Sequence, residues 1–313
     1  MEFQDVLKKA TLANQKKQLE ENPYASFENA IFLVDFNYVA IRNLFALYRG
    51  KEDNSTNPKV YYNILLQIFK NASKGSPIRI ILCHDHYLNW RKTVDPDYKN
   101  RRKGFKEQFN IDWKNFHRNL GQLVESCVKL FGIDHFCVKG CEADDLIAIL
   151  SRRLPGKKVI LSADKDLTQL IDKKTIQINP FDIKLKIMED GIQSKEEFVK
   201  AYAIAGQGKD DIPQIRKFLG IKTAIKILRG EKKVEFTPEE KKRIKLNEIL
   251  MDLNQIPRPV EDFVMKEMKK MDIGSFGDRN EILDFVEESQ FGRRFFDHLD
   301  FLNKFKKNRK EVF

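Results

Sequence analysis

Acidic side chains that could bind a metal are concentrated between residues 140 and 170, in the stretch GCEADDLIAILSRRLPGKKVILSADKDLTQL. They are Glu142, Asp144, Asp145, Asp164 and Asp166. Carboxylates gathered in one pocket repel one another, and either a cation or protonation must relieve that repulsion. Because clusters of oxygen ligands suit hard cations, these residues predict a site for Mg²⁺ or Mn²⁺. The alternative is a set of unrelated surface acids, which suits any single residue better than the whole set.

Three short apolar runs each end on aspartate and are predicted to be buried strands. They are 31–36 (IFLVDF), 78–85 (IRIILCHD) and 158–166 (KVILSADKD). They deliver Asp35, Asp85 and the pair Asp164 and Asp166. Runs 133–138, 175–179 and 184–189 are predicted to be further strands. In parallel α/β sheets, ligands bind beyond the carboxyl ends of the strands. The pattern therefore predicts an α/β domain with a central, mostly parallel sheet and acids at one edge.

A helix is predicted from the E-A-D-D sequence onward, with Leu146, Ile149 and Leu150 as its buried stripe. Acids in its first turn are also favoured by the helix dipole. If Glu142 is already helical, it shares a face with Asp145, and Asp144 points elsewhere.

The charge balance predicts a polyanionic partner, because the 313-residue chain has a net charge of +11 despite its acid cluster. The alternative is a lysine-rich, solubilising surface. Segment 91–106, RKTVDPDYKNRRKGFK, has seven basic residues against two acids and no apolar periodicity, so we expect it to be exposed or mobile. Tyr98 is placed to stack on bases or sugars. The bland alternative for the segment is a solvated loop. Its basic residues are Arg91, Lys92, Lys99, Arg101, Arg102, Lys103 and Lys106.

The composition, 42% hydrophobic, is that of a globular chain, and no apolar run approaches the roughly 20 residues of a membrane span. The beginning MEFQDVLKKA does not resemble a secretory signal. Four scattered cysteines indicate reduced thiols, so we expect a cytoplasmic monomer without membrane contact. His135, Cys137 and Cys141 match no common zinc spacing.

The last third of the chain is predicted to be helical. A capping box at 194–197 (SKEE) starts a helix through Ala205, and Thr237 and Asp278 start others. Between them, GQGKDDIPQIRKFLGIKTAIKILRG carries an acidic pair, Asp210 and Asp211, and then a helix–turn–helix. Backbone amides and a lysine at that turn are suited to binding phosphate. The residues concerned are Gly220, Lys222 and Thr223.

The order of these motifs resembles the 5′ nuclease (flap endonuclease) superfamily, and most of all its compact bacteriophage members. The resemblance covers roughly residues 31–230. It implies an N-terminal helical extension (1–30, with a helix over 5–20), a PIN-like nuclease domain (31–190) with a basic arch (87–110), and a helical DNA-binding and C-terminal region (191–313). By resemblance, the first metal ligands are Asp35, Asp85, Glu142, Asp144 and Asp164. Those of the second are Asp145, Asp166 and Asp210.

The same resemblance implies Mg²⁺-dependent 5′→3′ removal of RNA primers and 5′ flaps during lagging-strand synthesis, with two ions that Mn²⁺ can replace. Tyr98, Lys99 and either Arg101 or Arg102 resemble the catalytic residues of the arch. Gly220–Ala224 resembles a helix–three-turn–helix that grips duplex phosphates beside K⁺. The implied partners are forked, flapped or nicked DNA and RNA–DNA hybrid, with a single-strand-binding protein and a sliding clamp.

Two departures from the family pattern modify these expectations. Gln207 stands where the family has an aspartate, so we expect a weaker second metal site. The turn GIKTA lacks the usual second glycine, which affects the K⁺ site. Two other functions stay open: a non-catalytic, structure-specific DNA-binding replication accessory, and a small-molecule phosphatase. The phosphatase usually has D-x-D after its first strand, where this chain has Asp35-Phe36-Asn37.

Overall fold

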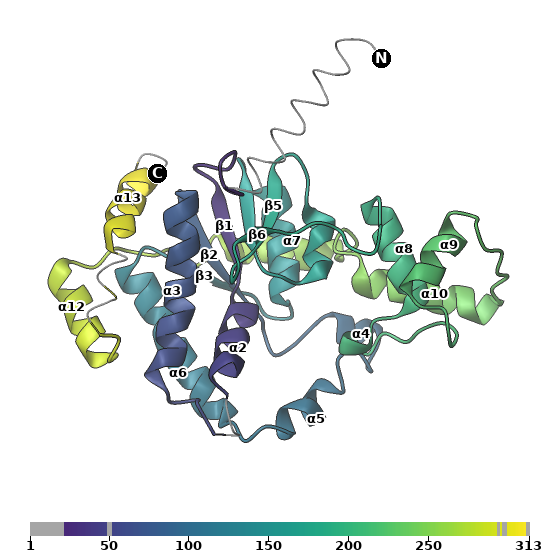
Figure 1. Cartoon of the computed structure of the whole chain (residues 1–313), viewed down its shortest axis with the longest axis horizontal. Helices are drawn as coiled ribbons and strands as arrows, with labels where there is room; N and C mark the ends of the chain where they lie inside the picture. The colour runs from purple at the N-terminus through teal and green to yellow at the C-terminus, as the bar shows by residue number, and fades with distance from the viewer. Residues whose placement is uncertain (1–21, 49–51, 293–294, 296–298, 311–313) are drawn as a thin grey trace, which may run out of the picture.

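The computed structural model describes residues 22–48, 52–292, 295 and 299–310. Its centre is a six-stranded sheet in the order β3-β2-β1-β4-β5-β6, in which only the β5–β6 pair is antiparallel (Figure 1). The strands are β1 (Ile31–Asp35), β2 (Arg79–His84), β3 (Asp134–Cys137), β4 (Lys158–Leu161), β5 (Thr175–Asn179) and β6 (Lys184–Leu185). The predicted mostly parallel sheet is confirmed, although β6 has two residues instead of the six expected.

The strand order reverses direction at β1, since β2 lies on one side of it and β4 on the other. In an open parallel sheet this switch point leaves a crevice outside the carboxyl ends of the strands. Asp35 pairs in register with Cys83, and Val34 with Leu161. The residues that follow β1, β2 and β4 therefore meet at one edge.

Helices cover both faces of the sheet, because alternate strand residues point to opposite sides. Phe32 and Val34 pack in one core with α2 (Phe36–Leu47), α3 (Pro58–Gly75) and α6 (Trp113–Leu130). Ile31 and Leu33 pack in a second core with α7 (Ala143–Arg153) and α11 (Arg258–Met268). The switch-point edge is thus held between two rigid layers.

The C-terminal helices lie at two ends of the molecule (Figure 1). One group, α8 (Lys195–Ala205), α9 (Ile221–Leu228) and α10 (Pro238–Met251), has its own core. The other, α12 (Arg279–Glu288) and α13 (Leu299–Lys310), packs on α6 and α3, where phenylalanines such as Phe295 and Phe305 join the main core. The predicted caps at Ser194, Thr237 and Asp278 are confirmed, but the capping box expected at 194–197 does not close, because Glu197 accepts from the N–H of Gln193 instead of Ser194.

The segment between β2 and α6 runs along the carboxyl edge of the sheet, past the α8–α10 end and back (Figure 1). It contains two short helices, α4 (Arg91–Val94) and α5 (Arg102–Glu107). We expected residues 91–106 to be exposed or mobile, but Arg91 and Tyr98 are buried, as is Trp90 just before them. Trp90 joins the core beside α7, Tyr98 joins the α8–α10 core, and Arg91 donates to the Leu250 carbonyl, so the first half of the segment is packed on the body of the protein.

Two further predictions are not tested by the structure. The helix expected over residues 5–20 lies outside the described residues, and the division of the chain at 30 and 190 stays a prediction. Among the residues that the structure describes, no helix is both long and apolar enough to cross a bilayer.

Candidate active site at the carboxyl edge of the sheet

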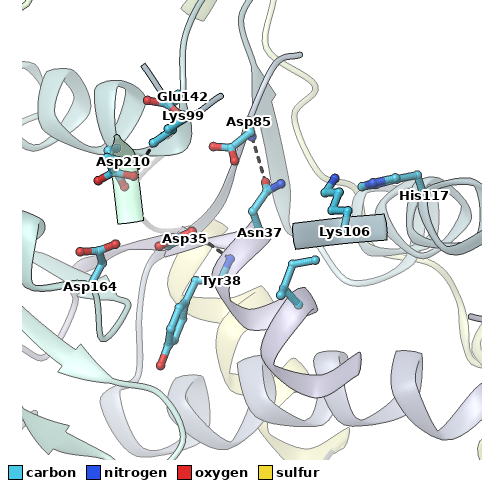
Figure 2. Close-up of a pocket in the computed structure, with 12 residues that line it drawn as sticks. Asp35, Asn37, Tyr38, Asp85, Lys99, Lys106, His117, Glu142, Asp164 and Asp210 are labelled. Atoms are coloured by element: carbon cyan, nitrogen blue, oxygen red, sulfur yellow. Dashed lines mark hydrogen bonds and ion pairs between the residues drawn. The ribbon is translucent and has the colours of Figure 1, made fainter. Parts of the chain in front are cut away.

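A cavity of about 440 Å³ opens at the switch point. Figure 2 shows Asp35, Asp85, Asp164 and Asp210 around it, with Lys99 beside Glu142 and Asp210 and with Lys106 and His117 on the other side. Its full lining is Asp35, Asn37, Tyr38, Ile41, Asp85, Lys99, Lys106, His117, Glu142, Asp144, Asp164 and Asp210. Six of the eight predicted metal ligands line this cavity, and Asp145 and Asp166 do not.

Asp35 and Asp85 each accept a hydrogen bond from the N-terminus of a helix, Asp35 from α2 and Asp85 from α7. Asp35 caps α2 by accepting a hydrogen bond from the backbone N–H of Tyr38 at 3.1 Å, and it accepts another from the Ser162 hydroxyl at 2.8 Å. Asp85 accepts a hydrogen bond at 2.7 Å from the N–H of Ala143, at the start of α7. Helix N-termini favour negative charge, so both carboxylates are held where that potential is positive.

The structure places the acids at the start of α7 differently from the helical arrangement considered above, in which Glu142 and Asp145 share a face. Glu142 is the N-cap, with extended backbone angles of φ −90° and ψ 162°, so the helix begins one residue later. Glu142 and Asp144 consequently line the cavity. Asp145 closes a capping box by accepting from the Glu142 N–H at 3.0 Å, and it is fully buried. Asp145 therefore does not line the cavity, and its role as a metal ligand stays a prediction.

Negative charge is poorly compensated on the β1 side of the cavity. Burial and the neighbouring Asp85 raise the pKa of Asp35 to about 7. Burial, followed by Asp164 and Asp35, holds the pKa of Asp144 well above its ordinary value. At Asp164 burial also raises the pKa, but Lys209, the Asp166 N–H and Lys99 together lower it by more, and the net shift is downward. Without a cation, Asp35 and Asp144 therefore tend to be protonated, and a bound cation would favour their charged forms.

The donor set fits a hard divalent ion, because every acidic ligand offers oxygen. Within the described residues, no three histidine, cysteine or acidic side chains already surround a single ion position. Mg²⁺ usually keeps several waters and binds through one or two carboxylates, so a site for it does not require three protein ligands around one point.

Among the catalytic candidates whose side chains the structure describes, Lys99 lines the cavity. Its backbone adopts a left-handed φ of 56°, and its N–H donates to the Asp210 carbonyl at 3.0 Å. Its ammonium lies 2.5 Å from a Glu142 oxygen and 3.7 Å from an Asp210 oxygen. The arch lysine is therefore anchored at both backbone and side chain before any substrate arrives.

Tyr98 and Arg91 are not where the sequence placed them. The Tyr98 ring is buried, and its hydroxyl donates to Glu142 at 3.1 Å, so it cannot stack on a base in this conformation. The Arg91 guanidinium lies 2.8 Å from Asp145 and 3.3 Å from Glu142 and is 3% exposed, so it does not face phosphate. We expected both residues to contact nucleic acid because their segment is basic and lacks apolar periodicity. Contacts with distant parts of the chain bury them instead.

The other predicted nucleic-acid residues are distributed over the surface. Lys106 lines the cavity, with its ammonium 4.8 Å from the centre of the Trp113 ring. Arg101 is 88% exposed and pairs with Asp211 at 3.1 Å, and Lys92 is exposed. The side chains of Arg102 and Lys103, at the start of α5, lie outside the described part.

The turn at Gly220 lies at the start of a helix, α9, as the sequence predicted. Gly220 caps α9, with Lys222 exposed in the first turn and Thr223 half-buried. None of the three lines the cavity. The stretch 211–219 contains no helix, so the pair around this turn is α8 and α9, joined by residues 206–220.

Several residues of the site escaped the sequence reasoning. Ser162 and Asn37 position the backbone or carboxylates of Asp35 and Asp85, and His117 lines the cavity. Lys209 places its ammonium 2.9 Å from both oxygens of Asp164. Its position directly before Asp210, in a glycine-bounded turn, is a signal that the sequence offered.

This combination of a mostly parallel sheet, a carboxylate cavity at its switch point and lysines on the rim defines an α/β nuclease. A family model described as "5'-3' exonuclease, N-terminal resolvase-like domain" matches residues 30–203. That match spans more than half of the sequence, and the chain belongs to the 5′–3′ exonuclease family. It is a 5′–3′ exonuclease, and so a nuclease hydrolase.

Two sequence relatives agree with this assignment, and a solved structure shares the fold. The 5'-3' exonuclease of Buchnera aphidicola subsp. Schizaphis graminum is 29% identical over 220 residues, which cover 66% of this chain and 72% of the relative. Ribonuclease H of Enterobacteria phage T4 is 26% identical over 257 residues, covering 74% and 83%. Among solved structures, T5 5'-exonuclease with bound zinc ions superposes with a TM-score of 0.60 at 20% identity, covering 78% of this chain and 99% of the other.

Proposed function

We propose that this chain is a Mg²⁺-dependent 5′→3′ nuclease that removes RNA primers and 5′ flaps from duplex DNA during lagging-strand replication. The main support for this proposal is the cavity at the switch point. There, acids at the ends of β1, β2 and β4 and at the start of α7 lie beside Lys99 and Lys106. Anionic ligands and cationic residues in one cavity match a scissile phosphate held at a metal.

The residues proposed to hold the divalent ion are those of the cavity wall: Asp35, Asp85, Glu142, Asp144 and Asp164. When bound, Mg²⁺ would supply an activated water and stabilise the leaving oxygen. Lys99 would place positive charge where the phosphate gains negative charge, a contribution that depends on its being fixed in advance. Its bonds to Asp210 and Glu142 provide that fixation.

The proposed substrate is forked, flapped or nicked duplex DNA or RNA–DNA hybrid. Support comes from the net charge of +11 and from Lys222 at the exposed start of α9, where backbone amides and a lysine can bind phosphate. The family resemblance adds a helix–three-turn–helix role with K⁺ for α8 and α9. A T5 D15 flap endonuclease variant, 19% identical with a TM-score of 0.60 over 77% of this chain and 98% of the other, was crystallised with DNA and metal ions.

The test uses a 5′-labelled forked duplex and its RNA-primed counterpart, each with and without Mg²⁺. We expect short 5′ products that require Mg²⁺, and we expect Asp144→Asn to abolish them while leaving DNA binding intact. Asp272→Asn is a matched control, since Asp272 lies on the surface away from the cavity. Structure-specific binding without Mg²⁺-dependent products would instead identify a non-catalytic accessory protein.

A further inference from the structure

Positive charge is distributed unevenly over the acid cluster. The acids on the α4–η2 side have cationic partners from the chain itself: Asp145 pairs with Arg91 at 2.8 Å, Asp166 with Lys209 at 3.1 Å, Asp211 with Arg101 at 3.1 Å and Asp210 with Lys99 at 3.7 Å. Here η2 denotes the 3₁₀ turn Gly208–Asp210. Each of these carboxylates therefore already has a cation beside it without an added ion.

The β1 side differs. Within the described part of the chain, Asp35 and Asp144 form no ion pair with lysine or arginine; Asp35 is satisfied by the Ser162 hydroxyl and the Tyr38 N–H. Both carboxylates line the cavity, whereas Asp145 and Asp166 do not. One half of the cluster therefore requires an external cation, and the other half does not.

The contacts of Asp166 leave little capacity for a metal. The Gln207 amide donates to both carboxylate oxygens, at 2.8 and 3.0 Å, and Lys209 lies against one of them. The same ammonium lies 2.9 Å from each oxygen of Asp164, so it bridges the two aspartates of the D-x-D sequence. A second divalent ion at Asp166 would have to displace an amide and a lysine and then sit near an unfavourable positive charge.

Gln207 and Lys209 are complementary in this arrangement. An aspartate at 207 would face Asp166 with a like charge and demand a second ion, whereas a glutamine supplies hydrogen-bond donors. Lys209 is held there by the 3₁₀ turn η2, and its side chain is 40% exposed at the rim of the cluster. The residues present thus fit one divalent ion and do not fit a second.

We propose that Lys209 is a resident cation that takes the place of a second divalent ion, with Gln207 as its partner, so that the chain binds one ion at the β1 side. A role of this single ion in catalysis rests on the proposed function. This single-ion arrangement replaces the expectation of a second, weaker ion at Asp145, Asp166 and Asp210, because Arg91, Gln207 and Lys209 occupy the first two of those acids.

The test counts bound Mn²⁺ by calorimetry and equilibrium dialysis, without DNA and without turnover. The wild type should bind one ion per chain. Gln207→Asp/Lys209→Ala should bind two, with the affinity of the second ion at least about tenfold above any residual binding in the wild type, because a nearby like charge is gone. Lys186→Ala is the control, since Lys186 pairs with Glu189 on the surface at 2.6 Å, and it should bind one.

A second readout covers the case in which the double variant folds poorly. Lys209→Gln keeps a hydrogen-bonding side chain but removes the charge, so its metal-free melting temperature should fall and its rise on adding Mg²⁺ should exceed that of the wild type. Two equal Mn²⁺ sites in the wild type, or a variant count of one with an unchanged Mg²⁺ response, would overturn the inference. The forked-duplex assay decides the proposed function separately, since one bound ion without cleavage would refute only that function.

Discussion

Replacing Arg91 by methionine should destabilise the protein by about 3–5 kcal/mol, the usual cost of removing one partner from a buried ion pair. The size of this loss follows from the partners that Glu142 and Asp145 keep when Arg91 is removed. Glu142 keeps Lys99 at 2.5 Å, but Asp145 keeps only neutral donors among the described residues: the Trp90 indole at 3.1 Å and the Glu142 N–H at 3.0 Å. A fully buried carboxylate without a cation then carries most of the loss.

A second substitution isolates that cause. Asp145→Asn in the Arg91→Met background removes the uncompensated charge, so the double variant should recover at least half of the lost stability. Unfolding in urea, followed by tryptophan fluorescence, gives the free energies for a double-mutant cycle. Trp90 donates to Asp145 and reports directly on this site.

The same variant separates a structural role from a DNA contact. If Arg91 contacted phosphate, its loss would reduce the slope of log K against log salt by about 0.9. We expect an unchanged slope for the folded Arg91→Met protein, and a reduced slope for Lys222→Ala as the control. A stability loss below about 1 kcal/mol together with a reduced slope would refute the buried-pair reasoning.

Three further outcomes are expected. Asp164→Asn should abolish Mg²⁺-dependent cleavage while DNA binding is retained or tightened in gel-shift titrations, because a carboxylate that repels phosphate is neutralised. Thr237→Ala should cost about 1 kcal/mol in urea unfolding, because it removes the cap of α10. The Arg216 side chain lowers the pKa of Glu240 to about 2. That pairing therefore stabilises the fold above the ordinary glutamate pKa and is lost as pH falls toward 2; NMR titration of Glu240 in wild type and Arg216→Gln checks the shift.

Local sequence patterns determined the scaffold of this protein. Apolar runs ending on Asp35, Asp85 and Asp164 predicted parallel strands, and the sheet brings these acids to one cavity. Helix starts at Thr237 and Asp278 also followed from residues within one turn. Both kinds of signal are readable because the physical cause, alternation of side chains or capping of backbone N–H groups, acts between residues close in sequence.

Only the tertiary structure decided which charged residues are partners. Arg91 donates to the Leu250 carbonyl at 2.8 Å, 159 positions along the chain, and this contact buries a guanidinium that sequence alone assigned to DNA. Lys209 meets Asp164 across 45 positions, and a one-residue shift in the start of α7 exchanged Asp144 and Asp145 between cavity and interior. Burial and ion pairing depend on long-range packing, which has no local pattern, so a basic segment looks alike whether its charges face phosphate or a buried aspartate.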